Sequence, residues 1–206
     1  MRLLFVCTGN ICRSAAAHAL TAAWPAGHLG VTVEAASAGT HAPVGQPVHP
    51  LTARALENRG ITGQAHSSRR LSAADLQWAD VVLTMTTRHR EAVLALDPRA
   101  LRRTYTLREA AALCAGLTPH RLALVSPGDR GAVLADALAE VRATRRRPAV
   151  ENIEDPIDGG AELHARVVDE IAAALRTLLV AISRQVGGSE HDTVRVPRLP
   201  PVPQPA

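Results

Sequence analysis

The chain has 206 residues and a formal net charge of +4, and its 47% hydrophobic and 20% charged residues are an ordinary globular composition. Aromatic residues make up only 2%, which predicts an aliphatic core and almost excludes nucleic-acid binding by base stacking on aromatic side chains. Apart from histidines, every basic residue is Arg, which excludes a Schiff-base lysine and the lysine of P-loop nucleotide hydrolases.

The cysteines and the apolar runs exclude further classes. Cys7, Cys12 and Cys114 are an odd, low number for a secreted disulfide framework, and they lack the paired spacing of a zinc ribbon. The apolar run at residues 3–6 is too short for a signal peptide, and no run approaches the roughly 18 residues of a membrane span. We therefore expect a soluble, cytoplasmic protein without a membrane partner.

The first elements alternate between strand and helix. Residues 3–6 form an apolar run typical of a buried parallel strand, and Ser14 precedes an Ala-rich helical stretch. Residues 31–36 contain β-branched residues and predict a second strand, followed by a turn at residues 37–40. Residues 41–50 are rich in proline and predict a loop.

Alternation continues over the rest of the chain. Helices are predicted at residues 51–59, 87–96, 108–115, 129–142 and 160–186, and the first of them ends before Gly60. A further helix is predicted to begin after an N-cap at Ser72, with Asp75 in its first turn. Strands are predicted at residues 81–83 and 104–106. The pattern indicates an α/β three-layer sandwich in which helices flank a four-stranded parallel sheet. Residues 187–206 predict a disordered, Pro-rich tail that follows a single domain over residues 1–186.

The loop after the first strand carries the predicted chemistry. Cys7 is separated from Arg13 by five residues, and a helix follows directly. Such a loop directs backbone N–H groups and a helix dipole toward one point, where Arg13 can hold two phosphate oxygens. This positive environment favours the thiolate of Cys7, to which Ser14 can donate a hydrogen bond, and Gly9 allows a positive φ. The segment predicts a cysteine nucleophile that attacks phosphorus; a structural cysteine beside a helix cap is the simpler alternative.

Residues 7–14 resemble the signature of the low-molecular-weight protein tyrosine phosphatase family. The resemblance extends over about residues 2–116 and 150–185, and further matching segments are residues 37–40, Gly60-Ile61 with His66 and Arg69, residues 80–85, and Asp155-Pro156. Relative to the compact family pattern, residues 117–150 look like an insertion. Because this insertion directly precedes Asp155, it is a candidate for a lid over the cleft.

The resemblance implies a role for each matching residue. It makes Cys7 the nucleophile that forms a phosphocysteine, Arg13 the phosphate ligand, and Asp155 the acid that protonates the leaving oxygen and then activates water. It places the phosphate-binding loop at Thr8, Gly9, Asn10, Ile11, Cys12 and Ser14, supported by Ser37 and His66. It also implies a phosphorylated protein substrate and no cofactor or metal.

Two of these residues have alternatives when the sequence is read without the family. Asp155 lies among Glu151, Glu154 and Asp158, any of which could be a solvated loop charge, and Glu154 and Asp158 are the second choices for the acid. The resemblance implies that Cys12 can form a reversible disulfide with Cys7 and so protect it from further oxidation. A loop-packing role for Cys12 is the alternative.

The substrate side chain is the open question. Tyrosine-specific members line the cleft with aromatic residues, whereas this chain has His41-Ala42-Pro43-Val44 after the second strand and Ile157 after Pro156. Residues 85–90 and 105–107 resemble the branch that hydrolyses phosphoarginine in proteins. That branch carries Thr where this chain has Ile11, so phosphotyrosine remains our expectation and phosphoarginine the alternative.

Two further function classes fit the sequence less well. An arsenate reductase of the same fold needs two more cysteines after the third strand, and residues 84–100 contain none. A non-catalytic phosphate-binding module would be expected to lack the nucleophile, the arginine or the acid, and all three are present. The run Arg145-Arg146-Arg147 is expected to be a solvated loop and not a nucleic-acid site. The sequence leaves the oligomeric state open.

Overall fold

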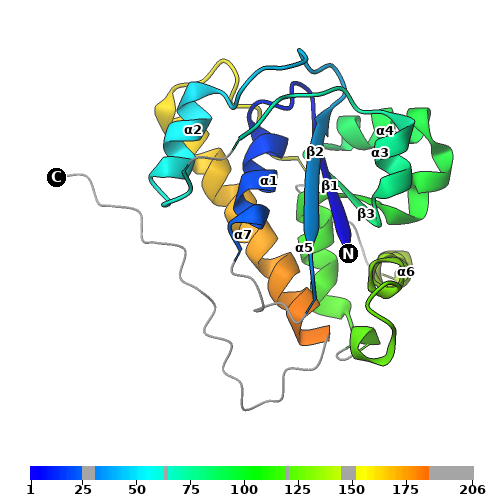
Figure 1. Cartoon of the computed structure of the whole chain (residues 1–206). Helices are drawn as coiled ribbons and strands as arrows, with labels where there is room; N and C mark the ends of the chain where they lie inside the picture. Colours follow the sequence, from blue (N-terminus) through cyan, green and yellow to red (C-terminus); the bar gives the residue numbers. More distant parts are fainter. Residues whose placement is uncertain (25–30, 63–64, 119–120, 145–151, 186–206) are drawn as a thin grey trace.

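The computed structural model describes residues 1–24, 31–62, 65–118, 121–144 and 152–185 (Figure 1). The predicted tail at residues 187–206 and the arginine run at residues 145–147 lie outside these ranges. None of the described helices is both long and apolar enough to cross a membrane.

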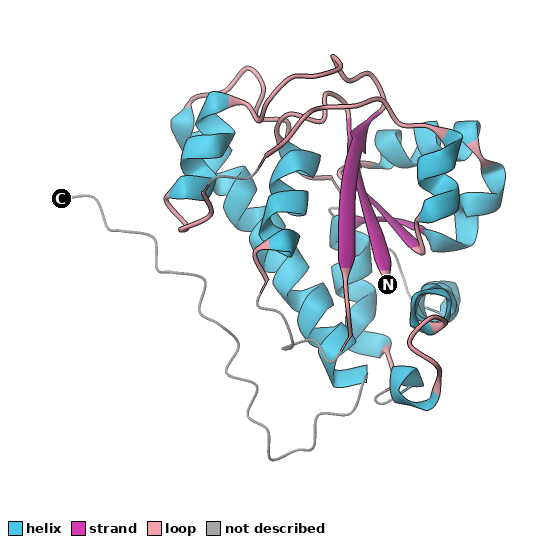
Figure 2. Cartoon of the chain, viewed as in Figure 1, coloured by secondary structure: helices cyan, strands magenta, loops and turns pink. Residues whose placement is uncertain are grey.

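The centre of the fold is a four-stranded parallel sheet, as predicted (Figure 2). Its strands lie in the order β2-β1-β3-β4, with bounds Glu34–Gly39, Arg2–Cys7, Val81–Thr84 and Thr104–Thr106. All neighbouring pairs are parallel, so the carboxyl ends of the strands meet at one edge of the sheet. In open α/β sheets this edge is where ligands bind.

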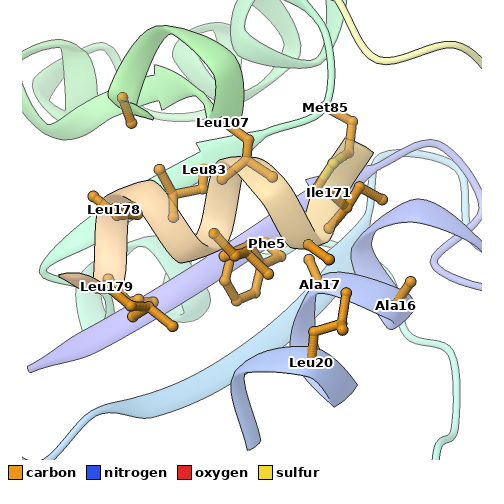
Figure 3. Packing of buried hydrophobic residues seen from close by; sticks show 14 of the residues in the cluster. Phe5, Ala16, Ala17, Leu20, Leu83, Met85, Leu107, Ile171, Leu178 and Leu179 are labelled. Atoms are coloured by element: carbon orange, nitrogen blue, oxygen red, sulfur yellow. The ribbon is translucent and has the colours of Figure 1, made fainter. Parts of the chain in front are cut away.

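Successive side chains of β1 enter two separate cores. Leu3, Phe5 and Cys7 face the helices α1, α5 and α7, whereas Leu4 and Val6 face α3 and α4. Phe5, the single phenylalanine, lies at the centre of the first core among aliphatic side chains that include Leu83, Ile171 and Leu178 (Figure 3). The alternation follows from the two-residue period of a strand, and it makes three layers.

The helices agree with the predicted positions to within a few residues. They are α1 Arg13–Ala22, α2 Pro50–Glu57, α3 Ala73–Trp78, α4 Thr87–Leu96, α5 Leu107–Leu113, α6 Arg130–Thr144 and α7 Ala161–Gln185. The predicted N-cap of α3 is a full capping box, in which the Ser72 and Asp75 side chains each accept from the other residue's backbone N–H. Gly60 follows α2 with a φ of 74°, which ends the helix.

The predicted second strand is three residues out of place. Residues 31–36 were expected to be extended and residues 37–40 a turn, but β2 runs to Gly39 because Ala38 and Gly39 pair with Val6 and Cys7. The small residues that suggested a turn are needed for close packing instead. A Cβ on Gly39 would lie 2.4 Å from the carbonyl oxygen of Thr8 and 3.0 Å from the backbone nitrogen of Asn10.

Replacing Gly39 with alanine should therefore displace the loop that follows β1. We expect G39A to lower the free energy of unfolding by about 1–3 kcal/mol, as overpacking of a close contact does. The measurement is urea unfolding of G39A, with Gly128→Ala as the control variant. A Cβ on Gly128 would meet only the Ser126 hydroxyl, at 3.9 Å. Equal stability of the two variants would contradict the packing argument.

The described part of the segment 117–150 covers the edge of the sheet. Tyr105 on β4 donates a hydrogen bond from its hydroxyl to the carbonyl of Ala135 on α6 (3.0 Å), and Arg142 donates to the carbonyl of Thr104 (2.8 Å). The Arg142 guanidinium also lies 3.9 Å from the centre of the Tyr105 ring and is paired with buried Glu109. Residues 121–144 thus protect an edge strand, and they do not form the lid considered above.

Candidate active site

The loop between β1 and α1 contains the predicted phosphate-binding residues. Cys7 is the last residue of β1, Arg13 is the first of α1, and residues 8–12 connect them at the carboxyl edge of the sheet. The positive φ expected at Gly9 occurs instead at Asn10, whose φ is 55°. Asparagine tolerates the left-handed region, and its side chain is fully buried here by the contacts described below.

Two hydrogen bonds reach the sulfur of Cys7. The backbone N–H of Asn10 donates to Sγ over 3.2 Å, and the hydroxyl of Ser14 lies 3.0 Å from the same atom. Ser14 itself accepts from Nδ2 of Asn10 at 3.0 Å, and its hydroxyl also donates to the carbonyl of Ala38 at 3.4 Å. Both groups therefore converge on the sulfur atom that the family resemblance makes the nucleophile.

Asn10 joins the loop to the rest of the site. Besides Ser14, its Nδ2 donates to the hydroxyl of Ser37 at 2.9 Å, and its Oδ1 accepts from the backbone N–H of Arg69 at 3.0 Å. The ring of His66 bonds to the Asn10 carbonyl over 2.6 Å. The structure thus brings together Asn10, Ser14, Ser37 and His66, as the family resemblance implied, and this network holds the loop in its left-handed turn.

Arg13 and Asp155 meet at the mouth of the loop. The Arg13 side chain is 4% exposed, forms an ion pair with Asp155, and donates a second hydrogen bond to the carbonyl of Ile153 (3.1 Å). Asp155 is 45% exposed, so it faces both the arginine and the solvent. Glu154 and Asp158, the second choices for the acid, are exposed and do not line the pocket.

A pocket opens at this point of the sheet. Its walls come from the loop after β1 and from the segment before α7, and they are formed by Cys7, Thr8, Gly9, Ile11, Cys12, Arg13, Asp155 and Ile157. Ile11 and Ile157 give it an aliphatic rim. Cys12 is buried, and burial raises the pKa of its thiol to about 11. Cys114 lies in the core, as expected, and burial raises its pKa to about 12.

The sequence analysis did not identify His89 as part of the site. The ring of His89 lies between two threonines: Nε2 is 2.8 Å from the hydroxyl of Thr8 in the phosphate-binding loop, and Nδ1 is 2.9 Å from Thr86, the N-cap of α4. Burial, and then the charge of Arg13, lower the pKa of His89 to about 4. His89 therefore positions the loop as a neutral ring.

The neutral state of His89 predicts acid sensitivity. Between its ordinary pKa of 6.5 and about 4, the unfolded chain binds a proton at His89 that the folded chain does not, so stability falls as the pH falls through this window. We expect the protonation of His89 alone to lower the free energy of unfolding by about 1–3 kcal/mol between pH 7 and pH 4. Urea unfolding across this range should show a shallower pH dependence for His89→Asn. An unchanged slope would contradict the assignment.

Comparison with known proteins places these features in a family. The family described as low molecular weight phosphotyrosine protein phosphatase matches residues 2–112. A low molecular weight protein-tyrosine-phosphatase of Streptomyces coelicolor is 32% identical over 195 residues, which cover 91% of this chain and 96% of that protein. The chain belongs to this family. It is accordingly a hydrolase with the cysteine-dependent chemistry typical of the family.

Two further relatives are named as arginine phosphatases. A protein-arginine-phosphatase of Geobacillus stearothermophilus is 37% identical over 110 residues, covering 52% of this chain and 70% of that protein. The solved structure of a YwlE arginine phosphatase mutant with a phosphorylated active site serine has 26% identity and a TM-score of 0.65, and the alignment covers 87% of this chain and 94% of that one. Similarity to both kinds of phosphatase leaves the substrate side chain to be decided from the pocket.

Proposed function

We propose that the protein is a protein-tyrosine-phosphatase that uses Cys7 as nucleophile, Arg13 as phosphate ligand and Asp155 as general acid and base. The observation that carries this proposal is that the three side chains line one pocket, although Asp155 is 142 residues from Arg13 in the chain. The solvated loop charge considered for Asp155 does not explain its pairing with a nearly buried arginine.

The geometry supports a two-step reaction. The Cys7 thiolate attacks phosphorus while the loop N–H groups and Arg13 hold the phosphoryl oxygens, and Asp155 donates its proton to the leaving oxygen as the ester bond breaks. The Asp155 carboxylate then removes a proton from water, which attacks the phosphocysteine and releases phosphate and the thiolate. The ion pair of Asp155 with Arg13 supports this division of roles, because phosphoryl oxygens compete with the carboxylate for the guanidinium.

Ile11 supports phosphotyrosine as the substrate. Ile11 and Ile157 are the aliphatic residues at the rim, and they can contact a tyrosine ring by apolar burial. An isoleucine at position 11 offers no hydroxyl to a guanidinium. The specific observation that favours phosphoarginine is the 37% identity with a protein-arginine-phosphatase.

The test is kcat/KM on matched phosphotyrosine and phosphoarginine peptides, with phosphoserine as the control substrate. We expect a preference for phosphotyrosine, and we expect Ile11→Thr to move the ratio toward phosphoarginine, with Ile157→Thr as the matched rim control. A preference of the unmodified chain for phosphoarginine would replace the proposal with its alternative. Phosphate binding without turnover of any peptide would assign the chain to the non-catalytic class.

The cellular setting follows from the same proposal. A phosphorylated protein is the expected partner, and the composition favours a cytoplasmic enzyme that does not bind nucleic acid.

Cys12 is expected to limit oxidative damage at Cys7. Peroxide converts the Cys7 thiolate to a sulfenic acid. The Cys12 thiol then attacks this sulfur, a disulfide forms and water is released, and an added thiol can reduce the disulfide. Mild peroxide should therefore inactivate the enzyme reversibly, and Cys12→Ser should recover much less activity after dithiothreitol. Equal recovery of the variant and the unmodified chain would refute this role.

A further inference from the structure

A second group of chemically active side chains adjoins the catalytic pocket and shares Cys12 with it. Cys12, His49 and His164 each place one potential ligand atom within 4.8 Å of the others. The three residues come from the phosphate-binding loop, the residue before α2, and the first turn of α7. Figure 1 shows α2 beside the beginning of α7, close to the loop that leads into α1. The mechanism above uses neither histidine.

The hydrogen bonding of the two histidines is incomplete. Their rings are stacked, with centroids 4.6 Å apart and planes 10° from parallel. Nδ1 of His164 lies 2.8 Å from the Thr52 hydroxyl, and the backbone of Pro156 also hydrogen-bonds to this ring. Nδ1 of His49 is buried without a hydrogen-bond partner among the described residues. Leaving a buried polar atom unpaired is costly, and such an atom indicates a missing ligand or a functional role.

The donor set selects a class of ligand. One thiolate and two neutral imidazoles suit Zn²⁺ and similar thiophilic cations, and they are poor ligands for Mg²⁺ or Ca²⁺. We propose that Cys12, His49 and His164 form a three-ligand site for Zn²⁺ that leaves a fourth position for water. This site does not include the nucleophile Cys7, and neither His49 nor His164 has a family role described above.

Admitting the ion requires the three side chains to move. Adjacent ligand atoms of a tetrahedral zinc site lie about 3.5 Å apart, given bonds of about 2.0–2.3 Å. The three side chains must therefore close by roughly 1 Å, and the stacked rings must tilt out of parallel so that both lone pairs reach one ion. His49 is half-buried and gives access from solvent, whereas Cys12 and His164 are buried.

The electrostatics of His164 agree with a ligand role. Burial, and then the neighbouring His49, lower the pKa of His164, which keeps its ring neutral and able to donate a lone pair. The Thr52 hydroxyl orients the same ring, as outer-sphere partners do in metal sites. An ion at this position would join the phosphate-binding loop to α7, and it would hold Cys12 as a metal thiolate.

The test measures metal binding directly, so its outcome is independent of whether the chain is a phosphatase. Zn²⁺ is titrated into the reduced full chain in competition with a chromogenic chelator, and Co²⁺ is used to detect a thiolate-to-metal charge-transfer band. We expect one Zn²⁺ per chain and a cobalt band. The affinity should fall by at least about 100-fold in Cys12→Ser, His49→Gln and His164→Gln, because losing even an outer-sphere partner costs 10- to 100-fold.

Two matched controls identify the site. Cys7→Ser, which removes the other cysteine of the loop, and His41→Gln, which changes an exposed histidine, should both keep the affinity and the cobalt band. Loss of zinc in Cys7→Ser would place the metal on the nucleophile and overturn the proposal. Absence of the cobalt band in the unmodified chain, or unchanged affinity in Cys12→Ser, would also overturn it. Absence of the cobalt band is read from the unmodified chain, so this outcome overturns the proposal even where a substitution impairs folding.

Discussion

Substituting Cys7 with serine should lower turnover of a phosphotyrosine peptide by at least about 10⁴-fold, as loss of a catalytic nucleophile does. A serine hydroxyl stays protonated at neutral pH, so the attacking anion is lost. The loop N–H groups and Arg13 remain. We therefore expect the variant to bind inorganic phosphate with an affinity within a few-fold of the unmodified chain.

The measurement is steady-state release of phosphate, with Cys114→Ser as the matched control, because Cys114 is a second buried cysteine that lies outside the pocket. Cys114→Ser should keep normal kcat/KM. Sustained turnover by Cys7→Ser would exclude a cysteine nucleophile here.

Replacing Asp155 with alanine should lower kcat by about 10²–10⁴-fold on a substrate with a poor leaving group. An alkoxide or phenolate must receive a proton as it leaves, and Asp155 is the carboxylate that lines the pocket. The loss should shrink for a leaving group that is stable as an anion, because that group needs less protonation. KM should rise little, since Arg13 still binds the phosphate.

Asp158→Asn provides the matched control, because Asp158 is an exposed neighbour that does not line the pocket. The readout is the dependence of kcat on leaving-group basicity for a series of aryl phosphates. A steeper dependence in Asp155→Ala, with no change in Asp158→Asn, is the predicted outcome. If Asp155→Ala hydrolysed the most basic leaving group at the normal rate, the acid would have to be a different residue.

The nucleophile loop could be predicted from sequence because its chemistry is local. Cys7, Arg13 and Ser14 lie within eight residues, at the junction of a strand and a helix that are each visible in composition. The alternation of strands and helices likewise predicted the parallel sheet and the edge at which the pocket opens. The family resemblance then supplied Asp155, which the sequence alone did not separate from its acidic neighbours.

Features that depend on distant contacts were not predictable in the same way. His89 contacts Thr8 across 81 residues of chain, and His164 contacts Thr52 across 112, so no local pattern marks either histidine. The end of β2 was misplaced for a related reason. Small residues at positions 37–40 are typical of a turn, and only the close approach of the loop at Thr8 and Asn10 explains why Gly39 is needed in a strand.

The central claim is that phosphate passes through a covalent bond to Cys7. The most direct measurement is mass spectrometry of Asp155→Ala, quenched with acid during turnover of an aryl phosphate with a good leaving group, because this variant is slow to hydrolyse the intermediate. We predict one added phosphoryl group on the peptide that contains Cys7. We predict no phosphocysteine when Cys7 is also replaced with serine. An unmodified Cys7 peptide during continuing turnover would contradict the account, because phosphate would then be transferred directly to water.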